Sequence, residues 1–192
     1  MSPLIVAGLD LSLTSTGGAK VQGGILAEPP WTFTIRSIRR GYERLDSMVN
    51  RIGAAIKEID PAVIVVEGPA LHATGSYVHE SAGLWWSVTH RIWKSGRPMA
   101  VVPPTVLKKF ATGKGNSDKS AMCVAAAHRF GLAEIGPDAA DALWLAAAGA
   151  QRYGQPVVSM PAAQVAVLTG IGKKGKPVID WPELPAPALT EG

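Results

Sequence analysis

The pattern of apolar positions predicts a sheet in the first part of the chain. Residues 4–10 form an apolar run, residues 17–26 turn apolar again after a polar segment, and residues 31–38 begin with alternating apolar and polar side chains. Runs of this length are typical of buried and half-buried strands. Glycine is frequent in residues 17–26, which is compatible with a bulge there. We therefore expect three antiparallel strands in a meander.

Further along, the spacing changes from that of strands to that of helices. Residues 42–59 carry apolar side chains at helical spacing, and Asp60 and Pro61 stop this helix. Residues 62–66 are wholly apolar, which is typical of a central strand covered on both faces. Beyond a loop at residues 70–78, the pattern predicts a strand at 98–102 and helices at 79–95, 105–110, 118–130 and 138–152. This alternation predicts an α/β layer fold.

The helix predicted at 79–95 has apolar side chains on more than one face. They include Leu84, Trp85, Trp86 and Trp93. Such a helix is buried on several sides, either within one chain or against a second subunit. Tryptophan is enriched at subunit interfaces. The helix is therefore a candidate dimer contact, and burial within a single chain is the alternative.

The last part of the chain differs in composition from the rest. It contains six prolines after residue 154 and a basic run at residues 173–176. We predict one domain at residues 1–154, followed by a proline-rich, basic and partly flexible extension at residues 155–192. Within this extension, residues 165–168 and 178–179 are expected to pair as a short hairpin around the basic run.

Overall composition narrows the class of protein. The chain has 192 residues, of which 47% are hydrophobic, so it is long enough for one domain with a core and too apolar to be wholly disordered. The single Cys123 excludes an internal disulfide and a cysteine-based zinc site. No apolar run reaches the ~18 residues of a membrane helix, and no secretion signal is recognisable, so we expect a cytoplasmic protein without a membrane partner. The net charge of +4 is compatible with a polyanionic partner.

Two apolar strands end in a carboxylate. Asp10 ends the first strand, and Glu67 ends the strand at residues 62–66. Asp is disfavoured inside strands and is rarely buried without a partner. One explanation for Asp10 is that it satisfies the amide groups of the following turn, and the other is a metal ion. If the two strands are neighbours in one sheet, the two carboxylates meet at its edge.

A second pair of acids opens the last long helix. Asp138 and Asp141 are three residues apart and therefore share a helix face. The helix dipole favours acids in a first turn, which explains either residue alone. Alanines at 139, 140 and 142 leave room for the helix backbone to approach the sheet.

The four acids together would repel one another unless cations neutralised them. Ligand sets made only of oxygen suit Mg²⁺ or Mn²⁺. Two such ions ~3.5–4 Å apart stabilise both the attacking and the leaving oxygen of an in-line phosphoryl displacement. The acids therefore indicate a two-metal site for phosphodiester chemistry.

A basic segment lies between the two groups of acids. It carries Lys108, Lys109, Lys114 and Lys119, with Ser117 as the expected N-cap of the next helix and Gly131 as its C-cap. These lysines could hold DNA phosphates beside the acids. The alternative is a solvated, charged face with no ligand.

Several of these motifs resemble the RuvC family of Holliday-junction resolvases over about residues 3–152. The resemblance rests on Gly8-Leu-Asp-Leu-Ser12 with Gly17, on Val65-Val-Glu67, on the basic segment at 108–120 and on Asp138-Ala-Ala-Asp-Ala-Leu143. It implies an RNase H-like fold, with a mixed sheet of three antiparallel strands followed by parallel strands and flanked by helices. It also implies a homodimer that acts as a crossover junction endodeoxyribonuclease, using Mg²⁺ to nick branched DNA symmetrically.

The resemblance also assigns roles to individual residues. Asp10, Glu67, Asp138 and Asp141 match the metal-binding acids of the family. Lys108 and Lys119 match basic residues that contact DNA near the scissile phosphate, and Lys109 and Lys114 extend this basic segment. The helix at 79–95 matches the dimer helix of the family.

The sequence departs from the family at the position of Ala70, where members often carry an aromatic residue that stacks on a base at the junction centre. His72 and Tyr77 are nearby but are not aligned with that position. The segment 103–105 and the extension after residue 154 also differ. Divergence of this kind is similar to that of bacteriophage-encoded members, some of which cut several branched structures, so the preference between junctions, flaps and forks stays open.

Two other function classes share parts of this pattern. Asp10, Thr14 and Gly17 are similar to the phosphate loop of actin-like and sugar kinases, although that fold usually needs two such domains. A non-catalytic dimer that binds branched DNA is the other alternative, and the presence of all four acids argues against it.

Overall fold

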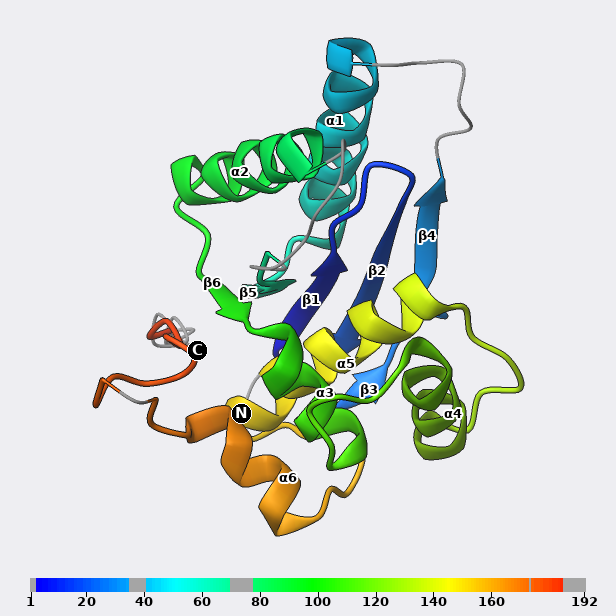
Figure 1. Cartoon of the computed structure of the whole chain (residues 1–192), viewed down its shortest axis with the longest axis vertical. Coiled ribbons are helices and arrows are strands. Elements are labelled where there is room, and N and C mark those ends of the chain that lie inside the picture. Colours follow the sequence, from blue (N-terminus) through cyan, green and yellow to red (C-terminus); the bar gives the residue numbers. More distant parts are fainter. Residues whose placement is uncertain (1–2, 35–40, 70–77, 173, 185–192) are drawn as a thin grey trace, which may run out of the picture.

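The computed structural model describes residues 3–34, 41–69, 78–172 and 174–184. Its centre is a six-stranded mixed sheet with helices on both faces (Figure 1). The strands are β1 (Ile5–Asp10), β2 (Ser15–Gln22), β3 (Ile25–Leu26), β4 (Trp31–Thr34), β5 (Val63–Glu67) and β6 (Met99–Val102). The helices are α1 (Gly41–Ile59), α2 (Val78–Lys94), α3 (Pro104–Thr112), α4 (Lys119–Phe130), α5 (Pro137–Arg152) and α6 (Ala162–Ala166), with a 3-10 turn η1 (Val167–Thr169).

The sheet joins an antiparallel half to a parallel half, as predicted. Its order is β3-β2-β1-β5-β6, and β4 also pairs with β2. The strands β2, β3 and β4 form the antiparallel half with β1, whereas β5 runs parallel to β1 and β6 runs parallel to β5. Helical connections carry the chain between the parallel strands, because parallel neighbours need a crossover.

The second predicted strand, at residues 17–26, is wrong in its extent. The strand β2 ends at Gln22, and Gly23 and Gly24 turn the chain with φ angles of 60° and 77°. Positive φ at two successive residues is the conformation of tight hairpin turns, and glycine adopts it without strain. The chain after this turn is β3, which returns along β2. The third strand is seen up to Thr34, and its expected continuation at residues 35–38 lies outside the described residues.

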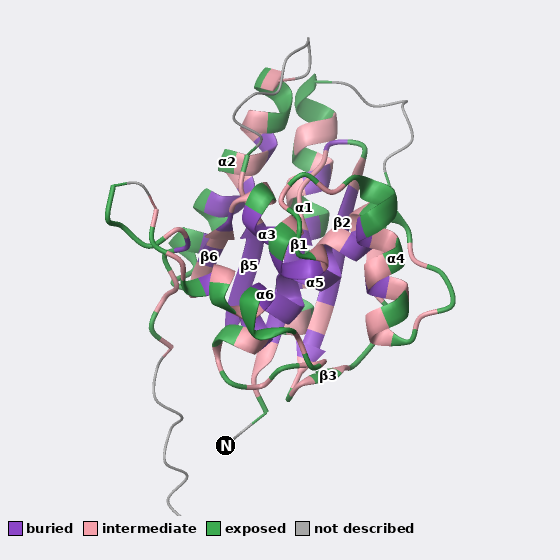
Figure 2. Cartoon of the chain, turned by 60° about the horizontal axis from the view of Figure 1, so that its bottom comes forward, coloured by how far each residue is buried: buried purple, intermediate pink, exposed green. Residues whose placement is uncertain are grey.

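The sheet separates two hydrophobic layers. On one face, α1 and α2 bury Met48, Ile52 and Leu84 against the sheet. On the other face, α3, α4 and α5 form the larger layer, in which Trp144 is fully buried. Figure 2 shows β1, β5 and much of α5 in purple, the colour of buried residues. The chain therefore folds as a three-layer α/β/α structure, as its pattern predicts.

The helix α5 lies unusually close to the sheet. A Cβ atom built on Gly8 would lie 2.0 Å from the carbonyl oxygen of Ala142, and one on Gly17 would lie 1.9 Å from that of Asp138. Such distances are far below van der Waals contact, so only glycine fits these two strand positions. The predicted close packing beside the small residues of α5 is confirmed, and it brings the first turns of α5 over the ends of β1 and β2.

The helix termini follow the sequence with one correction. The N-cap of α4 is Asp118, whose carboxylate accepts a hydrogen bond of 2.8 Å from the backbone N–H of Ala121, and it is not Ser117 as expected. The hydroxyl of Ser117 is instead 2.6 Å from that of Thr112, inside the preceding loop. Gly131 caps the other end of α4 in a left-handed conformation, as predicted. None of the helices in the described part of the chain is both long and apolar enough to span a bilayer.

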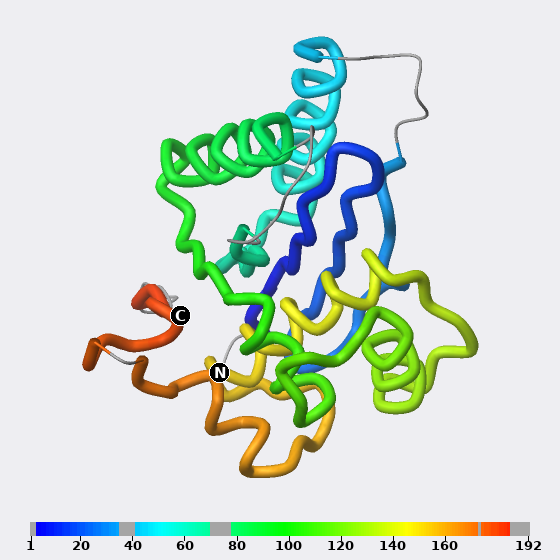
Figure 3. The backbone as a smooth tube through the Cα atoms, viewed as in Figure 1, coloured from blue at the N-terminus to red at the C-terminus, as the bar shows by residue number. Residues whose placement is uncertain are grey.

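The segment after α5 packs against the main core. Leu168 and Ile179 are buried in the same cluster as α5. The phenol of Tyr153 donates a 2.7 Å hydrogen bond to the carbonyl of Pro182. Figure 3 shows the orange segment turning beneath α3, with which α6 is in contact.

The hairpin predicted in this extension is wrong. Residues 165–168 belong to α6 and η1, and the structure has only a single bridge between Ile171 and Pro177 here within the described residues. The boundary at residue 154 stays a prediction.

Candidate active site

Asp10 and Glu67 lie side by side at one end of the sheet. Each is the last residue of its strand, and the parallel register pairs Leu9 with Val66, directly before them. The charge of Asp10 acts directly on the carboxyl group of Glu67.

Burial and like charge act together on this pair. Burial is the main cause that raises the pKa of Asp10 to about 7, and the charges of Asp141 and Asp138 add to it. Burial likewise raises the pKa of Glu67 to about 8, with further contributions from Asp10 and Asp141. Clusters of carboxylates are known to acquire such pKa values when they are desolvated together. The site therefore disfavours full ionisation of its acids, mainly because they are withdrawn from water.

The helix α5 supplies the other two acids of the cluster. Burial raises the pKa of Asp141 to about 6, and the charge of Asp138 contributes in the same direction. Both residues act on Asp10 although they are more than a hundred residues away in sequence. The close approach of α5 to Gly17 is what places them there, because Gly17 pairs with Asp10 in the sheet.

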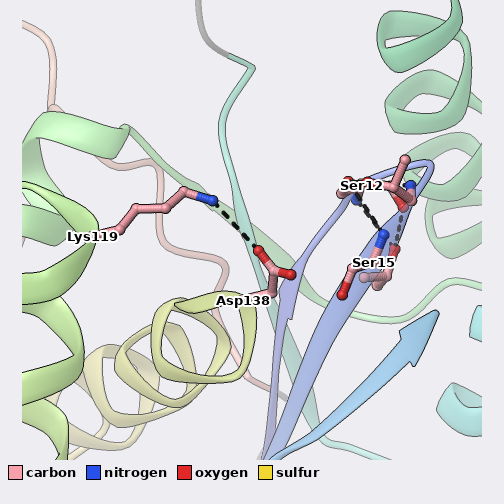
Figure 4. A network of polar contacts seen from close by, with 6 residues as sticks. Ser12, Ser15, Lys119 and Asp138 are labelled. Carbon is pink, nitrogen blue, oxygen red and sulfur yellow. Dashed lines mark hydrogen bonds and ion pairs between the residues drawn. The ribbon is translucent and has the colours of Figure 1, made fainter. Parts of the chain in front are cut away.

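Two of the predicted lysines reach the acids. The Nζ atom of Lys119 lies 3.5 Å from Oδ1 of Asp138, and Figure 4 shows the two side chains extended toward each other from α4 and α5. Burial lowers the pKa of Lys119, but the charges of Asp138, Asp10 and Asp141 outweigh burial and leave it raised. Lys108, half-buried on α3, lowers the pKa of both Glu67 and Asp141.

The other two lysines lie on the neighbouring surface. Lys109 and Lys114 are exposed, on α3 and on the loop that follows it. The stem of Lys109 packs near Gly115, where an added Cβ atom would lie 3.3 Å from Cε of the lysine. Neither lysine is among the charges that act on the acids within the described residues.

The turn between β1 and β2 uses its own hydroxyl groups. The Oγ atom of Ser12 accepts hydrogen bonds from the backbone N–H of Thr14 (3.3 Å) and Ser15 (3.5 Å) (Figure 4). The buried hydroxyl of Thr16 donates to the carbonyl of Ser12 at 2.8 Å and accepts from its N–H at 3.1 Å. The turn is therefore satisfied internally.

This turn differs from a nucleotide phosphate loop. The backbone N–H groups that would bind a phosphate already have partners in Ser12 and Thr16. Gly17, the glycine of the kinase-like pattern, lies in β2 against the carbonyl of Asp138. The glycine of this kinase-like motif therefore allows α5 to pack closely against the sheet.

The position of Glu67 depends on a contact that sequence reasoning missed. The indole N–H of Trp85, on α2, donates a 2.9 Å hydrogen bond to the carbonyl of Glu67. The N–H of Gly68 donates to the carbonyl of Val102 at 2.8 Å. Buried indole N–H groups usually find a hydrogen-bond acceptor. The sequence therefore indicated only that Trp85 would need an acceptor, and not which group would provide it.

The outer face of α2 exposes two tryptophans. The exposed fractions of Trp86 and Trp93 are 67% and 71%, whereas Leu84, Val88 and Ile92 face the core. The alternative in which this helix is buried wholly within one chain is therefore wrong. Ala70, His72 and Tyr77, the positions considered for base stacking, lie outside the described residues.

The residue types of this site fit a hard divalent cation. All four acids offer oxygen ligands, and burial together with like charge raises the pKa of Asp10, Glu67 and Asp141. Across the described ranges, no three His, Cys, Asp or Glu side chains converge closely enough to hold an ion between them as they stand. Asp138 pairs with Lys119, so a cation bound at Asp138 would share this carboxylate with the lysine or displace the lysine from it.

Comparison with known proteins identifies the fold. No family model matches the sequence, and no curated protein matches it either. The structure is similar to that of Thermus thermophilus RuvC, with 20% identity and a TM-score of 0.63 over 79% of this chain and 98% of that one. It is also similar to T. thermophilus RuvC in complex with a Holliday junction substrate, with 20% identity and a TM-score of 0.65 over 82% and 99%.

These similarities establish the fold, an RNase H-like mixed sheet flanked by helices, as predicted. A ROK hexokinase from T. thermophilus matches with a TM-score of 0.35 over 60% of this chain and 40% of that one, which is too low to bear on function.

Proposed function

We propose that this protein is a Mg²⁺-dependent endonuclease that resolves Holliday junctions and related branched DNA. The observation that carries the proposal is the set of four carboxylates, from β1, β5 and α5, which act on one another through burial and charge with Lys108 and Lys119 beside them. Clusters of ionisable groups with such perturbed pKa values are typical of catalytic sites. The fold is also similar to that of T. thermophilus RuvC in complex with a Holliday junction substrate, and this similarity supports the same proposal.

The proposed site holds two Mg²⁺ ions, which Mn²⁺ can replace. The ligands would be the carboxylates of Asp10, Glu67, Asp138 and Asp141. When bound, the ions supply the charge that helps water to attack phosphorus in line and that stabilises the leaving 3′ oxygen. The carboxylates must be ionised to act as ligands, and burial raises the pKa of Asp10 to about 7 and that of Glu67 to about 8, so this ionisation falls near neutral pH without metal.

The lysines would hold the DNA strand over the carboxylates. Lys119 pairs with Asp138, and the charge of Lys108 acts on Glu67 and Asp141, which supports a contact of both lysines with the scissile phosphate. Lys109 and Lys114, exposed beside them, would follow the backbone to neighbouring phosphates. Contacts of this kind position the nucleic acid without reading its sequence.

Two nicks in one junction need two active sites, and we propose a homodimer. Trp86 and Trp93 on α2 offer an apolar surface in the free chain, which a second copy would cover. The two copies would place their acidic sites at two strands of the junction, related by the symmetry of the dimer.

A cleavage assay on a synthetic four-way junction with Mg²⁺ tests this function. Paired, symmetric nicks with ligatable 5′-phosphate ends are expected, and a linear duplex of the same sequence should be cut much more slowly. Junction binding without cutting at any Mg²⁺ or Mn²⁺ concentration would identify a non-catalytic binding module. ATP turnover without DNA cutting would identify a phosphotransferase.

A further inference from the structure

The ion pair between Lys119 and Asp138 connects two helices across the acidic site. Lys119 is the first residue of α4 and Asp138 lies in the first turn of α5, with 3.5 Å between Nζ and Oδ1. The side chain of Lys119 is 70% exposed, whereas that of Asp138 is 24% exposed. Figure 4 shows the lysine side chain extended from α4 toward the carboxylate of Asp138. An exposed pair of this kind is only weakly stabilising and is easily exchanged for another partner.

Lys119 stands at a helix position that does not suit a cation. The N-terminal end of α4 carries the positive end of the helix dipole, and its N-cap carboxylate, Asp118, is engaged with the N–H of Ala121. Nothing within α4 therefore favours a lysine at its first residue. The favourable interactions of Lys119 come from outside the helix, from Asp138, Asp10 and Asp141.

The charge of Lys119 is shared by the whole cluster. Its ammonium group favours the ionised forms of Asp10, Glu67 and Asp141. A divalent cation bound to the same carboxylates would do the same and would repel the ammonium group. The lysine and the cation therefore compete for one set of charges.

We propose that Lys119 is an exchangeable counter-cation of this site. Its ammonium group pairs with Asp138 until a divalent cation takes that carboxylate, and it then moves to the DNA phosphate. The inference rests on the metal site of the proposed function and adds a coupling to it: Asp138 becomes a ligand only when Lys119 releases it. Uptake of the cation thereby releases Lys119 toward the phosphate.

Lys108 provides the matched comparison. It also acts on Glu67 and Asp141, but it is half-buried on α3 and makes no ion pair with Asp138 among the contacts of the described residues. A general effect of positive charge near the acids should appear at both lysines. Exchange at Asp138 should appear at Lys119 alone.

The first measurement is the reactivity of single lysines in the DNA-free protein. The protein is acetylated with an N-hydroxysuccinimide ester during a Mg²⁺ titration, and each lysine is quantified by mass spectrometry. Loss of the Asp138 partner should make the Lys119 amine more reactive, and we expect acetylation of this residue to rise about threefold at saturating Mg²⁺. Lys108 should change less, and Asp10→Asn should abolish the response of Lys119.

The second measurement is Mg²⁺ binding by calorimetry to Lys119→Gln and Lys108→Gln, again without DNA. By linkage, removing the competing lysine should tighten Mg²⁺ binding by a comparable factor of about three relative to Lys108→Gln. Equal affinities in the two variants, or Mg²⁺ binding to the wild type with unchanged Lys119 reactivity, would overturn the exchange and leave the nuclease proposal standing. Absence of Mg²⁺ binding to the wild type, with or without DNA, would overturn both.

Discussion

Burial of Asp10 disfavours its ionised form, and the same carboxylate is a proposed metal ligand. Its strand and the glycine opposite it place it under α5, where burial and the neighbouring acids raise its pKa. The run of apolar residues before it made a strand-end carboxylate predictable. The sequence could not show that Glu67 would lie beside it, because that placement depends on β1 and β5 being neighbours in the sheet.

Replacing Asp10 by Asn should separate cutting from binding. The amide keeps the size of the side chain but removes a metal ligand and a negative charge beside the phosphate. We expect cleavage of a four-way junction to fall by at least ~10²-fold, the size of effect seen when one group that stabilises transition-state charge is removed. Junction affinity in a gel-shift assay should be unchanged or tighter.

Asp180→Asn, at an exposed position of the C-terminal segment, is the matched control and should cut like the wild type. Loss of junction binding in Asp10→Asn, with its fold intact by circular dichroism, would assign Asp10 a structural role instead.

The raised pKa values predict how stability depends on pH without metal. Between about pH 4 and pH 8 the folded protein binds more protons than the unfolded chain, because Asp10, Glu67 and Asp141 titrate higher when folded. The free energy of unfolding should therefore fall as the pH rises through this window, by several kcal/mol, because one pKa unit corresponds to about 1.4 kcal/mol. Urea unfolding in a chelating buffer at pH 5 and pH 8 measures this difference.

Glu67→Gln should flatten that dependence and stabilise the metal-free protein at pH 8, whereas Glu58→Gln, at an exposed position of α1, should not. Mg²⁺ should restore stability to the wild type at pH 8 and have less effect on Glu67→Gln. A wild-type stability that rises between pH 5 and pH 8 would contradict the buried acidic cluster.

At the scale of elements, the approach of α5 to the sheet positions half of the acids. The short spacing of small residues in α5 predicted close packing, and Gly8 and Gly17 supply the other side of that contact. The second strand was predicted too long because paired glycines suit a bulged strand as well as a tight turn. Only the pairing of β2 with β3 decides that Gly23 and Gly24 turn the chain.

Gly17→Ala should displace the start of α5. The added Cβ atom meets the carbonyl of Asp138, which is backbone and cannot rotate away. We expect a loss of about 1–3 kcal/mol in the free energy of unfolding, as for other overpacked sites, together with slower cleavage. Chemical denaturation and the junction assay measure the two effects.

Gly136→Ala is the control, because nothing lies within 4 Å of the Cβ position at Gly136. It should change stability by no more than about 0.5 kcal/mol, which is usual for surface positions. Equal stability and activity in Gly17→Ala and Gly136→Ala would show that the packing of α5 does not set the site.

At the scale of the whole molecule, the alternation of strands and helices made the three-layer fold predictable. The C-terminal segment was harder to predict, because its prolines and lysines suggest a loose extension. Leu168 and Ile179 nevertheless complete the layer around α5. Isolated apolar residues in a polar segment carry no periodic signal, so their burial depends on a surface that only the folded chain offers.

Trp86→Arg should convert the protein from a dimer to a monomer in analytical ultracentrifugation. A charged side chain at the centre of an apolar contact would be desolvated without a partner. Val124→Arg, which changes an exposed apolar residue of α4, should leave the dimer intact. A dimer that survives in Trp86→Arg, or is lost in Val124→Arg, would move the interface away from α2.

The central claim is that the four carboxylates share a metal site, and crystals soaked in Mn²⁺ test it most directly. The anomalous difference map should show Mn²⁺ bound between Asp10, Glu67, Asp138 and Asp141, with the carboxylate of Asp138 rotated away from Lys119. A map without a peak at these residues would contradict this claim, if the crystals were soaked at an Mn²⁺ concentration that saturates DNA binding.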